Sequence, residues 1–121
     1  MSKAWTLSCL LDDISARAEA VDGKVFLNRN ASALHELTEK IASYPTNEEA
    51  QFWINIIPLS DYFDDLLGSW DCNDIVVSTL IEKISDSILR NLRSQFPEHI
   101  LKGKILFDDD ELMLQIMEAT R

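Results

Sequence analysis

The chain has 121 residues, of which 46% are hydrophobic, and its formal net charge at pH 7 is −10. This length and composition indicate a single domain, residues 1–121, with a hydrophobic core, and they exclude a disordered chain. The negative charge argues against direct binding to nucleic acid or to anionic membranes, because both would repel the protein. No apolar run approaches the ~20 residues that cross a bilayer.

The cysteines and the N-terminal sequence both bear on the compartment. Cys9 and Cys72 are too few for a disulfide framework and are typical of two reduced thiols. The first residues, MSKAWTLSCLLDD, lack the pattern of a secretory signal peptide. We therefore expect a cytoplasmic protein in which both thiols are unpaired.

Residues 7–18 predict the first helix, because apolar residues recur there at the spacing of one helix face. Asp22-Gly23 is expected to end this helix. The apolar run KVFLN that follows, residues 24–28, fits either a short strand or an extended link. A second helix is expected to begin after a cap at Asn30 or Ser32. Its inward-facing residues would be Leu34, Leu37, Ile41 and Tyr44.

The sequence Thr46-Asn-Glu-Glu49 forms a capping box, in which Thr46 can accept from the N–H of Glu49 and Glu49 can reach back. The third helix that it opens would turn inward Ala50, Trp53, Ile54 and Ile57. Pro58 is expected to end or kink this helix, because proline lacks the amide hydrogen. Ser60 is then expected to cap a short fourth helix, which Gly68 closes.

The longest helix is expected to begin near Asp71 or Asn73 and to stop at Pro97. Its apolar stripe runs over four turns and consists of Val77, Leu80, Ile81, Ile84, Ile88 and Leu92. Asp108 and Glu111 are then expected to open a last helix. That helix would place inward Leu112, Ile116 and Met117.

Together these elements predict an all-α fold, a single-domain bundle of five to seven helices. Two short apolar runs, Val25–Leu27 and Ile105–Phe107, could pair as a minor two-stranded ribbon. No internal repeat, low-complexity segment or linker interrupts the chain.

The sequence indicates no metal or cofactor site. His35 and Glu39 lie four residues apart on one helix face, but a dedicated site needs three or four ligands. The run DCNDIVVSTLIE resembles a calcium loop, yet Val76 stands where that loop needs glycine for its sharp turn. The three glycines of the chain form no phosphate-binding loop.

Catalysis is also not indicated. A carboxylate pair for acid–base chemistry could be drawn from Asp61, Asp64 and Asp65, but such chemistry needs a cleft that separates the two pKa values. A solvated acidic surface explains the same residues. The serines, cysteines and two histidines do not combine by spacing into a nucleophile with its base. We therefore expect a binding protein and not an enzyme.

The charge is unevenly distributed along the chain. Residues 41–82 contain eight of the 21 acidic residues and none of the 11 Lys and Arg residues, together with six of the ten aromatic residues. Ordinary surfaces mix both signs, since like charges repel, so a basic partner is the expected compensation. Tyr and Trp would serve as anchors in such an interface and the carboxylates would steer association.

We therefore predict a partner-binding surface for a basic protein within this segment. Asp71 and Asp74 could alternatively serve as caps at the N-terminus of the longest helix, where the helix dipole favours negative charge. The predicted surface consists of Glu48, Glu49, Asp61, Tyr62, Asp64, Asp65, Trp70, Asp71 and Asp74.

In size, acidity, helical character and acid-aromatic surface, the chain resembles the immunity proteins of bacterial toxin systems, those of colicin nucleases and of contact-dependent growth inhibition. The helical colicin DNase inhibitors carry a Tyr-Tyr pair beside acidic residues, and the nearest analogue here is Tyr62-Phe63 within SDYFDD. The resemblance implies a protein that binds a basic nuclease toxin and blocks its active site or substrate groove by mimicking phosphate charge.

Three other classes remain open from the sequence. Acidic secretion chaperones have a similar size and pI, but they resemble α/β sandwiches and need convincing strands, which the sequence lacks. A phage-encoded nucleic-acid mimic would share the acidic surface and differ in its target. A helical adaptor is the remaining alternative.

Overall fold

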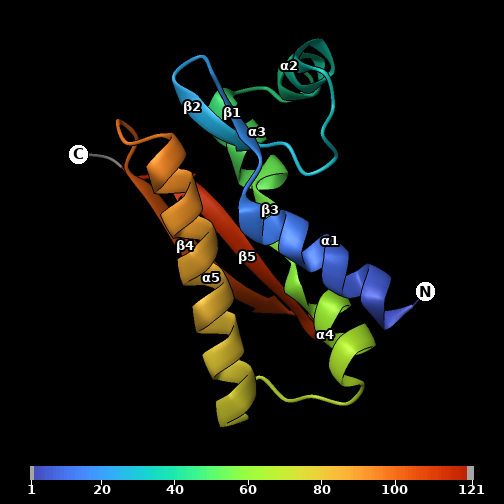
Figure 1. The fold of residues 1–121 in the computed structure, drawn as a ribbon. Helices are drawn as coiled ribbons and strands as arrows, with labels where there is room; N and C mark the ends of the chain where they lie inside the picture. Colours follow the sequence, from blue (N-terminus) through green and yellow to red (C-terminus); the bar gives the residue numbers. More distant parts are fainter. Residues whose placement is uncertain (1, 120–121) are drawn as a thin grey trace.

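The computed structural model describes residues 2–119, which form five helices and five strands (Figure 1). The chain is therefore mixed α and β, and the prediction of an all-α bundle is wrong. In chain order the elements are α1 (Lys3–Ser15), β1 (Ala18–Val21), β2 (Lys24–Leu27), α2 (Leu34–Ala42), α3 (Asn47–Ile54), β3 (Ile56–Pro58), α4 (Leu59–Leu67), α5 (Ile75–Gln95), β4 (Leu101–Asp108) and β5 (Glu111–Glu118). None of the helices in the described part is both long and apolar enough to cross a membrane.

The strands form two antiparallel sheets. β1 and β2 make a hairpin, and β3, β5 and β4 make a three-stranded sheet with β5 in the centre. The predicted ribbon between residues 25–27 and 105–107 is not formed, because each run pairs with its own neighbour in the chain. Asp22-Gly23 is the turn of the first hairpin and does not end a helix; both residues have positive φ, as a two-residue hairpin turn requires.

The predicted last helix is instead the strand β5. Leu112, Leu114 and Ile116 are each no more than 1% exposed, so burial follows the two-residue period of a strand. Asp109 and Asp110 have φ of 48° and 63° and join β4 to β5 in a two-residue turn. Leu112 and Ile116 do lie in the core as expected, but on a strand.

The five other predicted helices are present, with local differences. The Thr46 side chain accepts from the N–H of Glu49 as predicted, at 3.1 Å. Ser60 does not cap α4: it lies inside the helix, buried, and its hydroxyl accepts from the N–H of Leu112. Trp53 does not face inward; it is 54% exposed, because α3 turns Ala50 and Ile54 toward the core instead.

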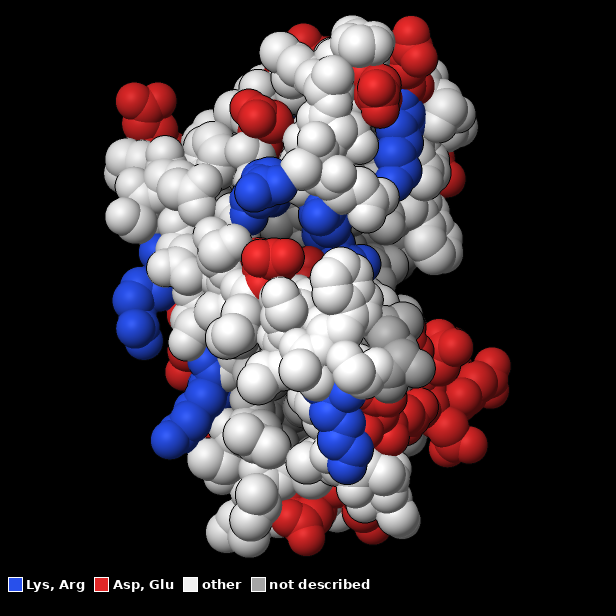
Figure 2. Space-filling view, turned by 45° about the vertical axis from the view of Figure 1, so that its right-hand side comes forward, with Lys and Arg blue, Asp and Glu red and all other residues white. Residues whose placement is uncertain are grey.

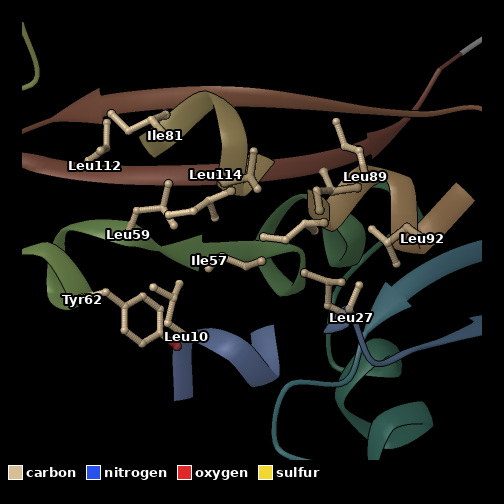
Figure 3. Close-up of a cluster of buried hydrophobic side chains, with 14 of the residues drawn as sticks. Leu10, Leu27, Ile57, Leu59, Tyr62, Ile81, Leu89, Leu92, Leu112 and Leu114 are labelled. Atoms are coloured by element: carbon tan, nitrogen blue, oxygen red, sulfur yellow. The ribbon is translucent and has the colours of Figure 1, made fainter. Parts of the chain in front are cut away.

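Two hydrophobic clusters hold the fold together. The larger one lies between α5, α1, α4 and the three-stranded sheet, where Leu112 and Leu114 of β5 point among side chains of the surrounding helices (Figure 3). The smaller one joins β2 to α2 and α3 and consists of Phe26, Leu37, Ile41, Ala50 and Ile54. In Figure 1 this smaller part forms the upper end of the molecule, and α4 lies at the lower right.

Buried amide side chains connect the hairpin to the larger sheet. Asn55, which is fully buried, accepts from the N–H of Leu27 at 2.8 Å and donates to the carbonyl oxygens of Val25 and Ile116. Gln51 also donates to the Val25 carbonyl and accepts from the N–H of Glu118. These bonds satisfy groups that would otherwise be buried without partners.

Candidate partner-binding site

The structure divides the three aspartates of α4 between two hollows. Asp64 lines one hollow, between α4, the loop that leads to α5, and the β4–β5 turn. Asp61 and Asp65 line another, beside Trp5 of α1. The sequence placed all three on one side of a short helix, and the structure instead sends them to different surroundings.

The first of these, which we term the acidic hollow, is open and has a volume of about 760 Å³. It contains four carboxylates and two large aromatic side chains, and its lining includes neither Lys nor Arg. The lining residues are Asp64, Gly68, Ser69, Trp70, Asp71, Cys72, Asp74, Phe107 and Asp110. Four of the residues predicted for partner binding are thereby brought together: Asp64, Trp70, Asp71 and Asp74.

Trp70 is held in place within the acidic hollow. Its indole Nε1 donates to the carboxylate of Asp64 at 2.6 Å, and its ring meets Phe63 edge-on with centroids 5.6 Å apart. Gly68 has a φ of 72°, which lets the chain leave α4 and return past the end of the helix. Trp70 therefore presents a half-buried aromatic surface in a fixed orientation.

Asp74 performs the capping role considered for it, whereas Asp71 lies before α5 and does not cap the helix. Asp74 accepts from the N–H of Val76 at 2.8 Å and caps α5, and Asp71 accepts from the N–H of Asn73 at 2.9 Å. Both residues remain exposed. Their carboxylates have more acceptor sites than these bonds use, so each can still bind a cation.

Phe107 and Asp110 belong to the acidic hollow, and the sequence reasoning missed both. Phe107 lies near the end of β4 and Asp110 lies in the β4–β5 turn, where Asp108, Asp109, Asp110 and Glu111 are four acidic residues in succession. In the space-filling view, acidic side chains gather at the lower right, the end of the molecule to which α4 belongs (Figure 2). The run DDDE between two apolar segments was the sequence signal for this turn.

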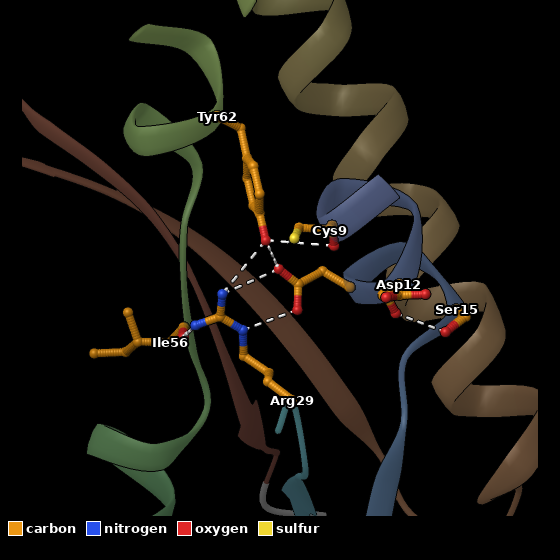
Figure 4. A network of polar contacts seen from close by, with 7 residues as sticks. Cys9, Asp12, Ser15, Arg29, Ile56 and Tyr62 are labelled. Carbon is orange, nitrogen blue, oxygen red and sulfur yellow. Dashed lines mark hydrogen bonds and ion pairs between the residues drawn. The ribbon is translucent and has the colours of Figure 1, made fainter. Parts of the chain in front are cut away.

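Tyr62 has a different environment from the one predicted. It is 8% exposed, and its hydroxyl is hydrogen-bonded to the carboxylate of Asp13 (Figure 4). Arg29 holds the same carboxylate through two nitrogens, at 2.8 and 3.1 Å. Tyr62 therefore joins α4 to α1 and is not presented as a surface anchor.

The charges around Tyr62 perturb its ionisation. Burial, reinforced by the hydrogen bond and the negative charge of Asp13, raises the pKa of Tyr62 to about 12. Burial alone would lower the pKa of Arg29, but the bond to Asp13 and its charge outweigh this effect and raise it. The phenol thus stays neutral at physiological pH, and the cluster acts as a structural link.

The remaining predicted residues lie outside the acidic hollow. Glu48 and Glu49 are exposed in the first turn of α3. Asp61 and Asp65 border the hollow at Trp5, whose volume is about 290 Å³ and whose lining also includes Arg29. These four residues therefore do not line the acidic hollow together with Asp64, Asp71 and Asp74.

Comparisons with known proteins add no relatives. No known family matches the chain, and neither the curated proteins nor the solved structures include a significant match. Within residues 2–119, no group of three or more His, Cys, Asp or Glu side chains is arranged to hold a metal ion. Cys9 and Cys72 are both unpaired in the structure, and Cys72 borders the acidic hollow.

Proposed function

We propose that this protein binds and neutralises a basic bacterial toxin, a nuclease of the kind that immunity proteins inhibit, and that it performs no catalysis. The observation that carries the proposal is the acidic hollow, in which four carboxylates surround Trp70 and Phe107 without any Lys or Arg. Such a surface repels nucleic acids and anionic membranes, and it attracts a protein with clustered Lys and Arg.

The aromatic side chains give the acidic hollow more than long-range attraction. Trp70 and the 52% exposed Phe107 offer flat apolar surface to the aliphatic stems of Lys or Arg, and their π faces attract the cationic ends. The carboxylates then pair with cations that the aromatic rings partly shield from water. Interfaces of this kind derive most of their affinity from a few anchors and their association rate from the surrounding charge.

The resemblance to immunity proteins supplies the class of partner. Asp64, Asp71, Asp74 and Asp110 would occupy the positions that phosphates take on the toxin, and so exclude its substrate. The proposed site of action is the cytoplasm, where two unpaired thiols such as Cys9 and Cys72 persist.

A second candidate is an acidic chaperone for a secreted protein. This class was disfavoured because the sequence lacked convincing strands. The structure contains a three-stranded sheet that packs against α5, so that objection no longer applies. Such a chaperone would bind an extended segment of its client, whereas an immunity protein binds a folded toxin domain. A phage nucleic-acid mimic or an adaptor would use the same carboxylates on a different target.

The proposal expects a neighbouring gene to encode a folded toxin domain, and the test measures binding to that domain. The double variant Asp71→Asn and Asp110→Asn removes two charges from the acidic hollow while keeping the side-chain shape, and Asn tolerates the positive φ at position 110. We expect the association rate at low salt to fall roughly tenfold and to depend less on salt than in the wild type.

The matched control is Glu39→Gln with Asp86→Asn, which makes the same change of net charge at exposed residues outside the acidic hollow. This control should retain most of the wild-type association rate. If the two double variants associate at equal rates, the acidic hollow is not part of the interface. Binding of an unfolded client segment, with no binding of a folded toxin, would favour the chaperone.

A further inference from the structure

The strand β4 has one side that pairs with no strand among residues 2–119, because it forms an edge of the three-stranded sheet. The register sets Leu101 opposite Glu118, and the N–H of Ala119 donates to the Ile100 carbonyl at 2.7 Å. The Ile100 carbonyl therefore points toward β5. Backbone groups alternate in direction along a strand, so odd-numbered residues of β4 direct theirs away from β5.

Gly103, Ile105 and Phe107 thus direct their N–H and C=O groups toward the open side of β4. The preceding group on this side, the Leu101 carbonyl, is already bound by Arg93 of α5 at 2.9 Å. An edge strand with free backbone groups is a template for another strand, and most proteins protect such edges with charge or cover them.

α5 does not cover this end of β4. It packs closely at Gly103, where an added Cβ would lie 3.1 Å from the side chain of Leu89. Beyond that point Ile105 is 39% exposed and Phe107 is 52% exposed, although both lie on the same sheet face as Gly103. The open edge therefore continues into an open apolar surface.

The charges on β4 identify the strand that fits this edge. Lys102 and Lys104 lie near its beginning and Asp108 lies at its end, all on the sheet face opposite to Gly103. A reversed copy of the same strand places its acidic end beside the lysines. We propose that β4 pairs antiparallel with β4 of a second copy of this chain, about a two-fold axis beside Ile105, and so makes one continuous sheet through both copies.

This register follows from the charges and the free groups. Residues directly opposite in an antiparallel pair share a face, and the axis at Ile105 sets Lys102 opposite Asp108 of the second copy, twice by symmetry. It also sets Gly103 opposite Phe107, and each such pair exchanges both N–H···O bonds.

Neighbouring registers are worse. An axis at Lys104 would oppose two lysines directly, which is destabilising. An axis at Leu106 would require Gly103 to pair with Asp109, whose φ of 48° belongs to the turn and not to a strand. The dimer leaves Asp64, Asp71 and Asp74 of the acidic hollow outside the strand pair, but it takes in Phe107, which also lines the hollow. The two proposals therefore share this one side chain, and their tests measure different quantities, the mass of the protein alone and its binding to a toxin.

The test exchanges charges across the axis. In the variant Lys102→Asp, the new aspartate would lie opposite Asp108 of the second copy at both contacts. In the variant Asp108→Lys, the new lysine would lie opposite Lys102 of the second copy at both contacts. A mixed dimer of these two variants restores an opposite pair at both contacts. We expect twice the chain mass in sedimentation equilibrium for the wild type, the mass of one chain for each variant, and dimer again on mixing them.

A third variant keeps the test decisive if a charge reversal impairs folding. Ile105→Pro removes an N–H that makes no bond to β5, so proline is tolerated by the sheet itself and blocks only the strand pair. It should be monomeric with the wild-type circular dichroism spectrum. A wild type that stays monomeric at its highest soluble concentration, or single variants that remain dimeric, or a mixture that does not dimerise, would overturn the proposal.

Discussion

Tyr62 and Trp70 are both aromatic residues among aspartates, and the structure gives them opposite roles. Tyr62 is buried against Asp13, which is 49 residues away in sequence, whereas Trp70 is held by Asp64 only six residues away and borders the acidic hollow. The exposure of Asp64 could be predicted from the sequence, because a carboxylate without a paired cation seldom lies in a core. The sequence could not distinguish the two aromatic residues, because burial depends on a distant partner.

The pKa of Tyr62 makes the stability of the protein depend on alkaline pH. Because its pKa is raised from 10.0 to about 12, the contribution to stability is fully present below pH 10 and is lost as pH rises through 12. The variant Tyr62→Phe lacks this contribution. We expect its free energy of unfolding to decline less over this range than that of the wild type, by up to about 2 kcal/mol, in urea titrations at each pH.

Tyr44→Phe is the matched control for this prediction, since Tyr44 is half-buried beside the smaller hydrophobic cluster and does not touch Asp13. It should retain the wild-type decline. Parallel curves for Tyr62→Phe and the wild type from pH 10 to 12 would show that the phenol does not carry the pH dependence.

At the scale of elements, the five helices could be predicted from the sequence, whereas the β4–β5 hairpin could not. The stripe from Val77 to Leu92 and the caps at Thr46 and Asp74 are local signals, and the structure confirms these helices. β5 was misassigned because apolar residues occur at both odd and even positions of the run ELMLQIME, so that Leu112 and Ile116 fit both a helical and an alternating pattern. With the hairpin unrecognised, Phe107 and Asp110 could not be placed in the site.

The β4–β5 turn carries local strain that substitution can relieve. Asp110 has a φ of 63°, a left-handed conformation that glycine adopts without steric cost. We expect Asp110→Gly to raise the free energy of unfolding by about 1 kcal/mol in urea denaturation. Glu111→Gln removes the same charge at an exposed residue of the extended strand β5, and it should change stability by less than half of this. A destabilised Asp110→Gly variant would mean that the Asp110 side chain stabilises the turn.

For the whole molecule, the concentration of acid at one end lowers stability through repulsion. The net charge is −10, and the acidic hollow and the run 108–111 are near each other through Phe107 and Asp110. At 0.1 M ionic strength, salt largely screens the repulsion between exposed charges that lie more than about 10 Å apart. We expect the urea midpoint of the wild type to rise when sodium chloride is added at neutral pH.

The triple variant Asp64→Asn, Asp71→Asn and Asp110→Asn should gain less from salt than the wild type, since it lacks three of the repelling charges. A triple variant with the same loss of charge at Glu36, Glu39 and Asp86 should keep more of the gain. If both triple variants respond alike, the repulsion arises from the net charge and not from its concentration at the acidic hollow.

The amide side chains that join the hairpin to the sheet also limit aggregation. The N–H of Val25 donates to Glu118, the carbonyl of Val25 accepts from Gln51 and Asn55, and the N–H of Leu27 donates to Asn55. A foreign strand can add only where backbone groups are free, so in the folded protein these groups of β2 are closed to it. The apolar run KVFL is a hazard only before α3 docks, in the newly made or unfolding chain.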